Sequence, residues 1–213
     1  MTLAVAVDGP AAAGKGTLAR RLAAALDLPH LDTGLLYRAV GRLVLDAGAD
    51  PADAAAAEEA ATALRAEDLA RADLRGPAAD RASSLVAAHP PVRAALVAFQ
   101  RRFAEGGAVL DGRDIGTVIL PDAPVKLFVT ASHEERAWRR WLELRGRGRD
   151  VAFAEVAAEM AERDARDAGR DVAPLRPAAD AVVLDTTGLD ADAVFERAMA
   201  VVRERSRARR GVC

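Results

Sequence analysis

The sequence predicts an α/β fold in which a five-stranded parallel sheet is covered by helices. Short apolar, partly β-branched runs are the expected strands, at residues 3–7, 28–31, 108–110, 125–130 and 181–184. Helix-forming segments separate these runs, and strands that alternate with helices form parallel sheets. The length of 213 residues suits one such domain, and a hydrophobic fraction of 51% is enough to build its core.

Charge and composition exclude several classes of protein. The 30 basic and 32 acidic residues give a net charge of -2, which argues against a protein held on nucleic acid by bulk charge. No apolar run approaches the roughly 20 residues that span a bilayer, and the start MTLAVAVDGP lacks the basic residues of a signal peptide. The single cysteine, Cys213, has no partner for an internal disulfide. We therefore expect a soluble, cytoplasmic protein with neither a nucleic-acid nor a membrane partner. We also expect a monomer, although the sequence itself leaves the oligomeric state open.

The N-terminal elements are a strand, a glycine-rich loop and a helix. Good helix formers occupy residues 14–26, with leucines on one face, and the apolar run at 28–31 precedes a helix from about Leu35. Residues 46–82 differ, because they are alanine-rich, acidic and poor in large apolar side chains. This composition indicates weakly packed helices in a peripheral insert.

The second half of the chain returns to regular alternation. Ser132 and Glu135 predict a capping box at the start of a helix. The segment 145–150, RGRGRD, interrupts the helical pattern, and we expect it to be mobile. The last strand leads into a final helix that we expect to run from residue 191 to about 207, with a frayed, arginine-rich end.

The strongest functional signal lies between the first strand and the first helix. Four residues between Gly9 and Gly14 let a loop wrap a phosphate, while backbone N–H groups face the anion and Lys15 reaches the outer phosphates. Lys15 is one of only two lysines among the 30 basic residues, which a simple Gly/Ala-rich turn would not require. We predict that ATP binds Gly9, Pro10, Ala11, Ala12, Ala13, Gly14, Lys15, Gly16 and Thr17. Gly16 stands where most such loops carry Ser or Thr, and the Lys-Gly-Thr form resembles the nucleoside monophosphate kinases.

A second signal follows the strand at 108–110. Asp111 stands where a carboxylate neighbouring a phosphate loop commonly orients hydrated Mg²⁺, although a turn residue at a strand end is the alternative. We take Thr17 and Asp111 as candidate Mg²⁺ residues, acting through water. The segment 112–117, GRDIGT, follows at the carboxyl end of the strand, where ligands of open α/β sheets bind.

Seven motifs together resemble the bacterial cytidylate (CMP) kinases over nearly the whole chain. They are DGPAAAGKGT (8–17), LDTGLLYR (31–38), SLVAAHPPVR (84–93), DGRDIGT (111–117), PDAPVKLFVTAS (121–132), ERDARDAGR (162–170) and APLRPAADAVVLDTT (173–187). The resemblance implies a single P-loop kinase domain over 1–213, with a nucleoside-monophosphate-binding insert at 38–93 and a lid region at 143–169. It also implies transfer of the γ-phosphate of ATP to CMP and dCMP, with Mg²⁺.

The same resemblance implies roles for individual residues. Ser84, Arg93 and Asp114 would read the cytosine edge, and Arg38, Arg113 and Arg170 would hold the CMP phosphate. Arg163 and Asp167 would bind the ribose hydroxyls, with Thr33 and Tyr37 lining the site. Five arginines lie in and before the lid: Arg136, Arg139, Arg140, Arg145 and Arg147. Lys15, Arg113, Arg136, Arg139 and Arg140 are the candidate catalytic residues. A solvated helix face is the alternative for each arginine, but the alternating charges of 163–170 favour one ordered helical stripe.

Other functions remain as alternatives. A small P-loop kinase for adenylate or shikimate would use the same loop. A GTPase-type switch is disfavoured, because its Asn-Lys-x-Asp motif is impossible in a chain without asparagine. A nucleotide-binding module without catalysis would have lost Lys15 or the lid arginines. Lys126 lies within a predicted strand, where a structural role is expected, and none of the histidines has metal-ligand spacing.

Overall fold

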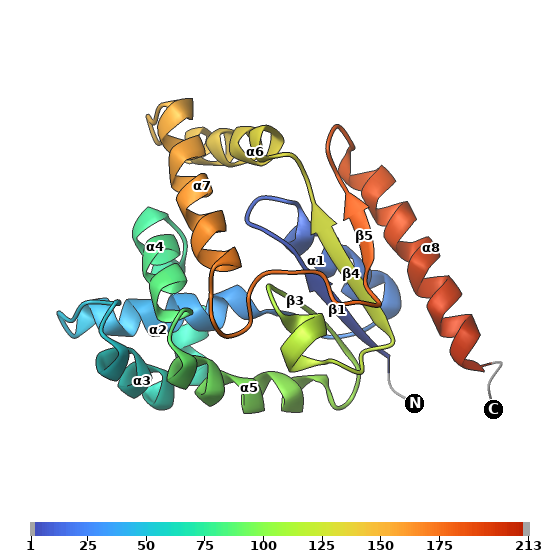
Figure 1. Ribbon diagram of the computed structural model, residues 1–213, viewed down its shortest axis with the longest axis horizontal. Coiled ribbons are helices and arrows are strands. Elements are labelled where there is room, and N and C mark those ends of the chain that lie inside the picture. The colour runs from blue at the N-terminus through green and yellow to red at the C-terminus, as the bar shows by residue number, and fades with distance from the viewer. Residues whose placement is uncertain (1–2, 211–213) are drawn as a thin grey trace. The chain divides into compact units, whose positions relative to one another are not determined.

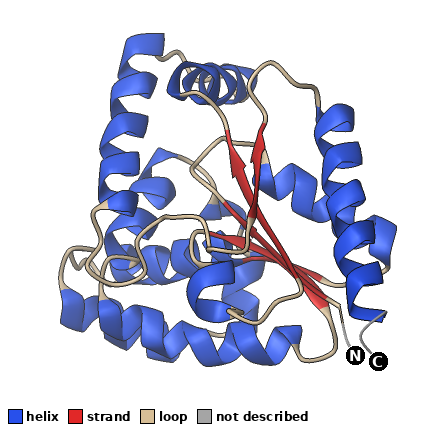
Figure 2. Ribbon diagram, turned by 45° about the vertical axis from the view of Figure 1, so that its right-hand side comes forward, coloured by secondary structure: helices blue, strands red, loops and turns tan. Residues whose placement is uncertain are grey.

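The computed structural model describes residues 3–210 and contains one parallel sheet (Figures 1 and 2). Its strands are β1 (Ala4–Asp8), β2 (His30–Asp32), β3 (Ala108–Gly112), β4 (Val125–Thr130) and β5 (Val182–Asp185). They are ordered β2-β3-β1-β4-β5, and β1 pairs in parallel with both β3 and β4. The predicted α/β class and the five strands are confirmed.

Eight α-helices and three short helical turns complete the described part of the chain. The helices are α1 (Lys15–Leu26), α2 (Thr33–Asp46), α3 (Ala54–Ala63), α4 (Pro77–Val86), α5 (Pro90–Ala104), α6 (His133–Gly146), α7 (Phe153–Ala168) and α8 (Ala191–Arg210). The turns are η1 (Ala66–Ala70), η2 (Ala72–Leu74) and η3 (Ile115–Ile119). Within residues 3–210, no helix is long and apolar enough to cross a membrane. Cys213 lies outside the described residues.

The chain divides into two compact units. The first comprises Met1–His30 and Ala104–Cys213, and the second comprises Leu31–Phe103. In the first unit, α1 and α8 pack against each other and against the sheet, and Figure 1 shows α8 running beside β4 and β5. Leu18 and Leu22 of α1 share a buried core with Val5, Val129 and Ala198. This core fixes the end of β1, from which the glycine-rich loop leaves.

Residue 9, the first of that loop, must be glycine because its backbone lies very close to the backbone of β4. A Cβ atom at Gly9 would lie 2.0 Å from the carbonyl oxygen of Val129 on β4. The φ of Gly9 is 150°, which side chains rarely adopt. The loop can therefore begin at this point only because residue 9 is glycine.

The second unit is built from close contacts between small side chains. Helix α2 packs against α3 and α4. A Cβ atom at Gly41 would lie 2.9 Å from the Cβ of Ala82, so α2 and α4 meet almost backbone to backbone. Ala57 and Leu74 are almost completely buried as well. Where these helices meet, small side chains let them approach closely enough to exclude water, while most residues of 46–82 are exposed or half-buried.

The ends of several elements differ from the predicted ones. Helix α2 begins at Thr33, directly after β2, and α8 continues to Arg210. Helix α6 continues to Gly146, so the interruption before α7 covers residues 147–152. Helix α7 ends at Ala168, which leaves Arg170 outside the helical stripe predicted for it.

The capping box predicted at the start of α6 is only half formed. Ser132 Oγ accepts a hydrogen bond from the backbone N–H of Glu135 at 3.2 Å. The N–H of Ser132, however, donates to Thr187 Oγ1 at 2.9 Å, and the Glu135 carboxylate accepts from Arg139. The backbone N–H of Ser132 is thus bound by Thr187, in the loop after β5, and not by the Glu135 side chain.

Candidate active site

The glycine-rich loop presents the uncapped start of a long helix. Gly14 is the N-cap of α1 with a φ of 91°, and among the described residues no side chain caps the helix or places an acidic group in its first turn. Helix N-terminal N–H groups that lack side-chain partners attract phosphate. Lys15 Nζ donates to the carbonyl oxygen of Pro10 at 3.3 Å, so its ammonium group lies over the loop. The loop therefore has the form of a phosphate site.

Two arginines of α6 lie at this loop, one in direct contact with it. Arg136 is buried and donates to the carbonyl oxygens of Ala131 and Ala11, and to Asp164 Oδ2 at 2.7 Å. Arg136 thereby links the loop to α7. Arg139 Nη1 would lie 3.9 Å from a Cβ atom placed on Gly14, which puts its guanidinium beside the loop.

Thr186 holds Arg139 in that position. Arg139 donates to Thr186 Oγ1 at 2.9 Å and to the Thr186 carbonyl oxygen at 2.7 Å. Thr186 Oγ1 also lies 3.1 Å from the carbonyl oxygens of Ala13 and Thr130. The hydroxyl of Thr186, 2% exposed, therefore joins the loop, β4 and Arg139 in one cluster.

The other three arginines before α7 are held elsewhere. Arg140 donates to Glu143 at 2.8 Å, and Arg147 pairs with Glu143 at 2.6 Å. The guanidinium of Arg145 lies 4.9 Å from the ring centroid of Trp141. Of the predicted catalytic arginines on α6, Arg136 and Arg139 adjoin the loop, while Arg140 donates to Glu143 on its own helix.

Asp111 lies beside the start of α1. Its Oδ2 would be 3.6 Å from a Cβ atom placed on Gly16, and its Oδ1 is 2.7 Å from His30 Nε2. Thr17 Oγ1 accepts a hydrogen bond from Arg20 at 3.5 Å. Among residues 3–210, no group of three or more His, Cys, Asp or Glu side chains is placed to hold a metal ion. A single carboxylate near a phosphate loop nonetheless suits Mg²⁺, which keeps several waters and binds the phosphates of a substrate.

Asp167 brings two of the predicted phosphate-binding arginines together. Its Oδ2 accepts from Arg113 Nε at 2.8 Å, and its Oδ1 accepts from Arg170 Nη2. Burial opposes the ionisation of Asp167, but the charges of Arg113, Arg170 and Arg163 outweigh it and hold its pKa at about 2. Burial likewise disfavours the Arg113 cation, yet the neighbouring carboxylates raise the pKa of Arg113 above its usual value. The cluster is therefore a permanently charged, cation-rich centre in the first unit.

Five further predicted residues belong to the second unit. Arg38 Nε donates to Asp80 Oδ1 at 3.1 Å, and its Nη1 lies 3.8 Å from Asp32 Oδ2. The guanidinium of Arg93 lies 5.7 Å from the ring centroid of Tyr37 and donates to the Ala87 carbonyl oxygen at 3.3 Å. The remaining two, Thr33 and Ser84, are buried.

Comparison with known proteins identifies the family. The family model described as cytidylate kinase matches residues 5–204. The chain is 68% identical to a cytidylate kinase of Granulibacter bethesdensis, covering 96% of this chain and 99% of that protein. It is 60% identical to a cytidylate kinase of Acidiphilium cryptum, covering 95% of this chain and 96% of that protein. The chain belongs to the cytidylate kinase family.

Solved structures give the same fold at much lower identity. An uncharacterized protein from Eubacterium ventriosum aligns with a TM-score of 0.57 and 14% identity, covering 96% of this chain and 99% of that one. A sugar kinase from Janibacter sp. aligns with a TM-score of 0.51 and 15% identity, covering 95% of each chain. At this identity, the two structures support the fold of this cytidylate kinase family member but not its function.

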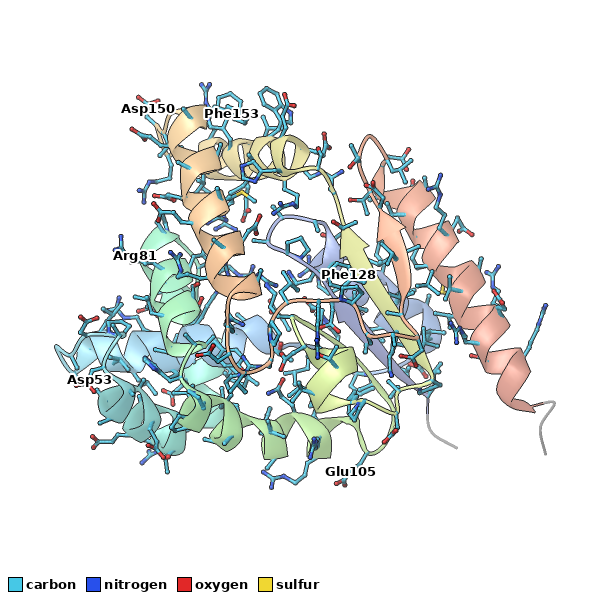
Figure 3. The ribbon with its side chains drawn as sticks, in the orientation of Figure 1. Asp53, Arg81, Glu105, Phe128, Asp150 and Phe153 are labelled. Carbon is cyan, nitrogen blue, oxygen red and sulfur yellow. The ribbon has the colours of Figure 1, made fainter. Side chains whose placement is uncertain are left out.

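In this cytidylate kinase family chain, the turn between α6 and α7 is bordered by aromatic rings. The ring centroids of Trp138 and Trp141 are 4.9 Å apart, and Phe153 meets Trp141 edge-on at 6.4 Å. Trp141 Nε1 donates to the carbonyl oxygen of Val151 at 3.0 Å. Figure 3 shows Asp150 and Phe153 where α6 leads into α7. Trp141 thus ties α6 to Val151, the residue that directly follows the segment 145–150 predicted to be mobile.

The sequence interpretation missed several residues of this cytidylate kinase site. Asp164, Thr186 and His30 contact predicted site residues from distant parts of the chain. Asp164 alone had a local signal, because it belongs to the charged repeat at 163–170. Lys126, for which a structural role is expected, donates to Asp180 Oδ1 at 2.8 Å and to the Pro121 carbonyl oxygen.

Proposed function

We propose that the chain transfers the γ-phosphate of ATP to CMP, and to dCMP, giving ADP and the nucleoside diphosphate. The observation that carries this proposal is the match to the cytidylate kinase model over residues 5–204. Two features of the first unit support it. The uncapped start of α1 suits the phosphates of ATP, and the Arg113–Asp167–Arg170 cluster suits a second anion.

The reaction needs little covalent work from the protein. The acceptor is a phosphate oxygen of CMP that is already ionised at neutral pH, so no side chain is required as a strong base. Catalysis then consists of aligning the two substrates and neutralising charge on the transferring group. Lys15, Arg136 and Arg139 are the cations whose positions at the loop support this role.

Mg²⁺ would enter this site with ATP. Asp111, beside Gly16, and Thr17 are the residues that would hold it, through water. When bound, the ion would offset negative charge on the β- and γ-phosphates. Asp111 also contacts His30, which leaves its Oδ2 directed toward the start of α1.

For base recognition we propose Asp114, Arg93 and Ser84. A carboxylate accepts from the exocyclic amine of cytosine, while a guanidinium donates to the ring carbonyl and nitrogen. Arg38, Arg113 and Arg170 would hold the CMP phosphate, and Arg163 and Asp167 the ribose, beside Thr33 and Tyr37. Since Asp167 already binds Arg113 and Arg170, it would also orient these two arginines for the phosphate.

All the proposed site residues belong to one chain, so we further propose that the protein acts as a monomer, in the cytoplasm where ATP is available. Size-exclusion chromatography with light scattering at the assay concentration tests the oligomeric state. A stable dimer would contradict that part of the proposal and leave the proposed reaction untouched.

The decisive experiment is a coupled ADP-release assay with CMP, dCMP, UMP, AMP and shikimate as acceptors. We expect CMP and dCMP to give the highest kcat/KM, with Lys15→Ala as the inactive reference. A preference for AMP or shikimate would overturn the proposed substrate. ADP release that is independent of any acceptor would indicate a nucleotide-binding protein that hydrolyses ATP.

A further inference from the structure

The last residue of β1, Asp8, makes contacts that the proposed chemistry does not explain. It is 4% exposed and directly precedes the glycine-rich loop. Its Oδ1 accepts from the backbone N–H of Ile115 at 2.8 Å, and its Oδ2 accepts from the backbone N–H of Gly116 at 2.7 Å. Both oxygens of a buried carboxylate are thus bound to the segment that follows Arg113 and Asp114.

These two N–H groups begin the helical turn η3. A residue at the N-cap, here Asp114, commonly uses its own side chain to accept from such groups. In the described part of the chain, however, the Asp114 side chain makes no capping hydrogen bond to this turn. Asp8 caps the turn in its place, which leaves the Asp114 carboxylate to other partners.

Gly116 is enclosed on two sides by the same arrangement. A Cβ atom there would lie 3.3 Å from Asp8 Oδ2 and 3.2 Å from Cδ of Lys126. Lys126 is itself buried and bound to Asp180 at 2.8 Å. Any side chain at residue 116 would therefore press on Asp8 and on an anchored lysine.

We propose that Asp8 is a positioning residue for CMP recognition: its carboxylate fixes the backbone after Asp114, and with it the directions of Arg113 and Asp114. This inference rests on the proposed function, since it assumes that Arg113 and Asp114 contact CMP. It adds a link between the strand that carries the ATP loop and the segment that reads the second substrate. Lys126 and Gly116 complete the link by leaving the turn no room to shift.

The charge of Asp8 offers a direct test of this link. Burial raises the pKa of Asp8 to about 6, with Asp114 adding to the rise, while the two backbone hydrogen bonds and Arg113 oppose it. Asp111 and Lys126 also lie near this strand end, since they pair with Val7 and Ala6 of β1 on the neighbouring strands. A protonated carboxyl group has one accepting oxygen and one O–H donor, as an asparagine amide has one acceptor and one donor group. At low pH the parent should therefore resemble the Asp8→Asn variant.

The experiment compares the parent, Asp8→Asn and the control Asp27→Asn, which makes the same change at an exposed helix end. At pH 8 we expect Asp8→Asn to lower kcat/KM for CMP by about 10- to 100-fold, with KM for ATP nearly unchanged. The melting temperature at pH 8 should not fall, because the variant no longer buries a charge. The parent-to-variant ratio of kcat/KM should approach one below about pH 6. Ionisation of CMP itself cancels in this ratio.

Three results would overturn the inference: unchanged CMP kinetics in Asp8→Asn, a loss confined to KM for ATP, or a ratio that does not change with pH. Gly116→Ala gives a second test that keeps the charge, and we expect it to weaken CMP use in the same direction. If Asp8→Asn does not fold, normal CMP kinetics in Gly116→Ala would overturn the inference. A parent enzyme that rejects CMP would instead contradict the proposed function.

Discussion

Buried Asp167 and partly exposed Arg113 form an ion pair, with Oδ2 of the carboxylate 2.8 Å from Nε of the guanidinium. The two residues are 54 positions apart in the chain, and the same carboxylate also holds Arg170. One anion therefore sets the positions of two cations. Removing this carboxylate would leave two neighbouring guanidinium groups without their shared anion, and they would repel each other.

We expect Asp167→Asn to lower both stability and CMP use. The fall in the pKa of Asp167 from 3.8 to about 2 corresponds to about 2–3 kcal/mol, which is the loss we expect in the free energy of unfolding. Because the pKa of Asp167 is about 2, below its ordinary value of 3.8, its ionised form stabilises the fold above about pH 4. That contribution is lost as the pH falls from about 4 toward 2. Urea unfolding of the parent and the variant should therefore converge at low pH.

The exposed Asp171→Asn change is the control for this prediction, because it removes the same charge nearby. It should leave the unfolding curve at pH 7 nearly unchanged. A parent-to-variant difference for Asp167→Asn that stays constant from pH 7 to pH 2 would contradict the assigned ion pair.

Lys15→Ala should abolish phosphoryl transfer without unfolding the protein. The variant removes the ammonium group over the loop, whose charge matters most as the transferring group loosens, so kcat should fall by orders of magnitude. Steady-state kinetics and a thermal melt measure the two effects. Arg203→Ala, an exposed cation on α8, is the control and should keep full activity. Turnover close to that of the parent would mean that the loop does not serve phosphoryl transfer.

Asp114→Ala should change the preference between pyrimidine substrates. A hydrogen bond to a charged group contributes about 1.5–3 kcal/mol, so kcat/KM for CMP should fall by roughly 10- to 150-fold. UMP presents a carbonyl where CMP presents the amine, and should lose much less. The measurement is the CMP-to-UMP ratio in parent and variant. An equal loss on both substrates would indicate that Asp114 acts only by supporting Arg113.

Residues 145–150 should exchange amide hydrogens quickly without nucleotide and slowly with a bisubstrate analogue, as expected for a lid that excludes water. The backbone bonds of this turn, such as Arg149 N–H to the Leu144 carbonyl oxygen, are local, so they can open without disturbing the sheet. Hydrogen exchange read by mass spectrometry measures the difference, with β4 as the internal reference. Identical exchange in both states would reject the lid assignment.

Gly41→Ala should lower the free energy of unfolding by about 1–3 kcal/mol, because the added methyl group overfills the contact between α2 and α4. This loss should exceed the gain in helix propensity. Gly106→Ala is the control, since a Cβ atom at Gly106 meets nothing within 4 Å. A Gly41→Ala protein as stable as the parent would show that the two helices separate freely.

The sequence predicted those features that depend on local pattern. The strands follow from short β-branched runs, and the phosphate loop follows from the spacing of Gly9, Gly14 and Lys15 between a strand and a helix. The resemblance added Arg113, Asp167 and Arg170 as site residues. Their mutual contacts required the fold, because β3 and α7 are distant in the chain.

The end of α7, the packing of the alanine-rich segment and the role of Asp8 could not be predicted, because each depends on contacts between distant parts of the chain. The end of α7 at Ala168 leaves Arg170 outside the helix, and tertiary context routinely overrides the helix propensity that the sequence shows. The alanine-rich segment gave no sign of close packing, because small side chains look the same in loose and tight contacts until their neighbours are known. Asp8 resembled an ordinary turn residue until Ile115 and Gly116 were placed opposite it.

The ring cluster on α6 has an optical consequence. The sequence contains two tryptophans, and both of them, Trp138 and Trp141, stand on this one helix beside the turn into α7. Trp138 is 48% exposed, and the indole N–H of Trp141 is bonded to Val151 within the turn. The tryptophan fluorescence of the protein therefore comes from this one region of the fold. Stopped-flow fluorescence of the unlabelled protein during nucleotide binding would consequently report on the surroundings of the α6–α7 turn, and closure of this turn as a lid should change the emission.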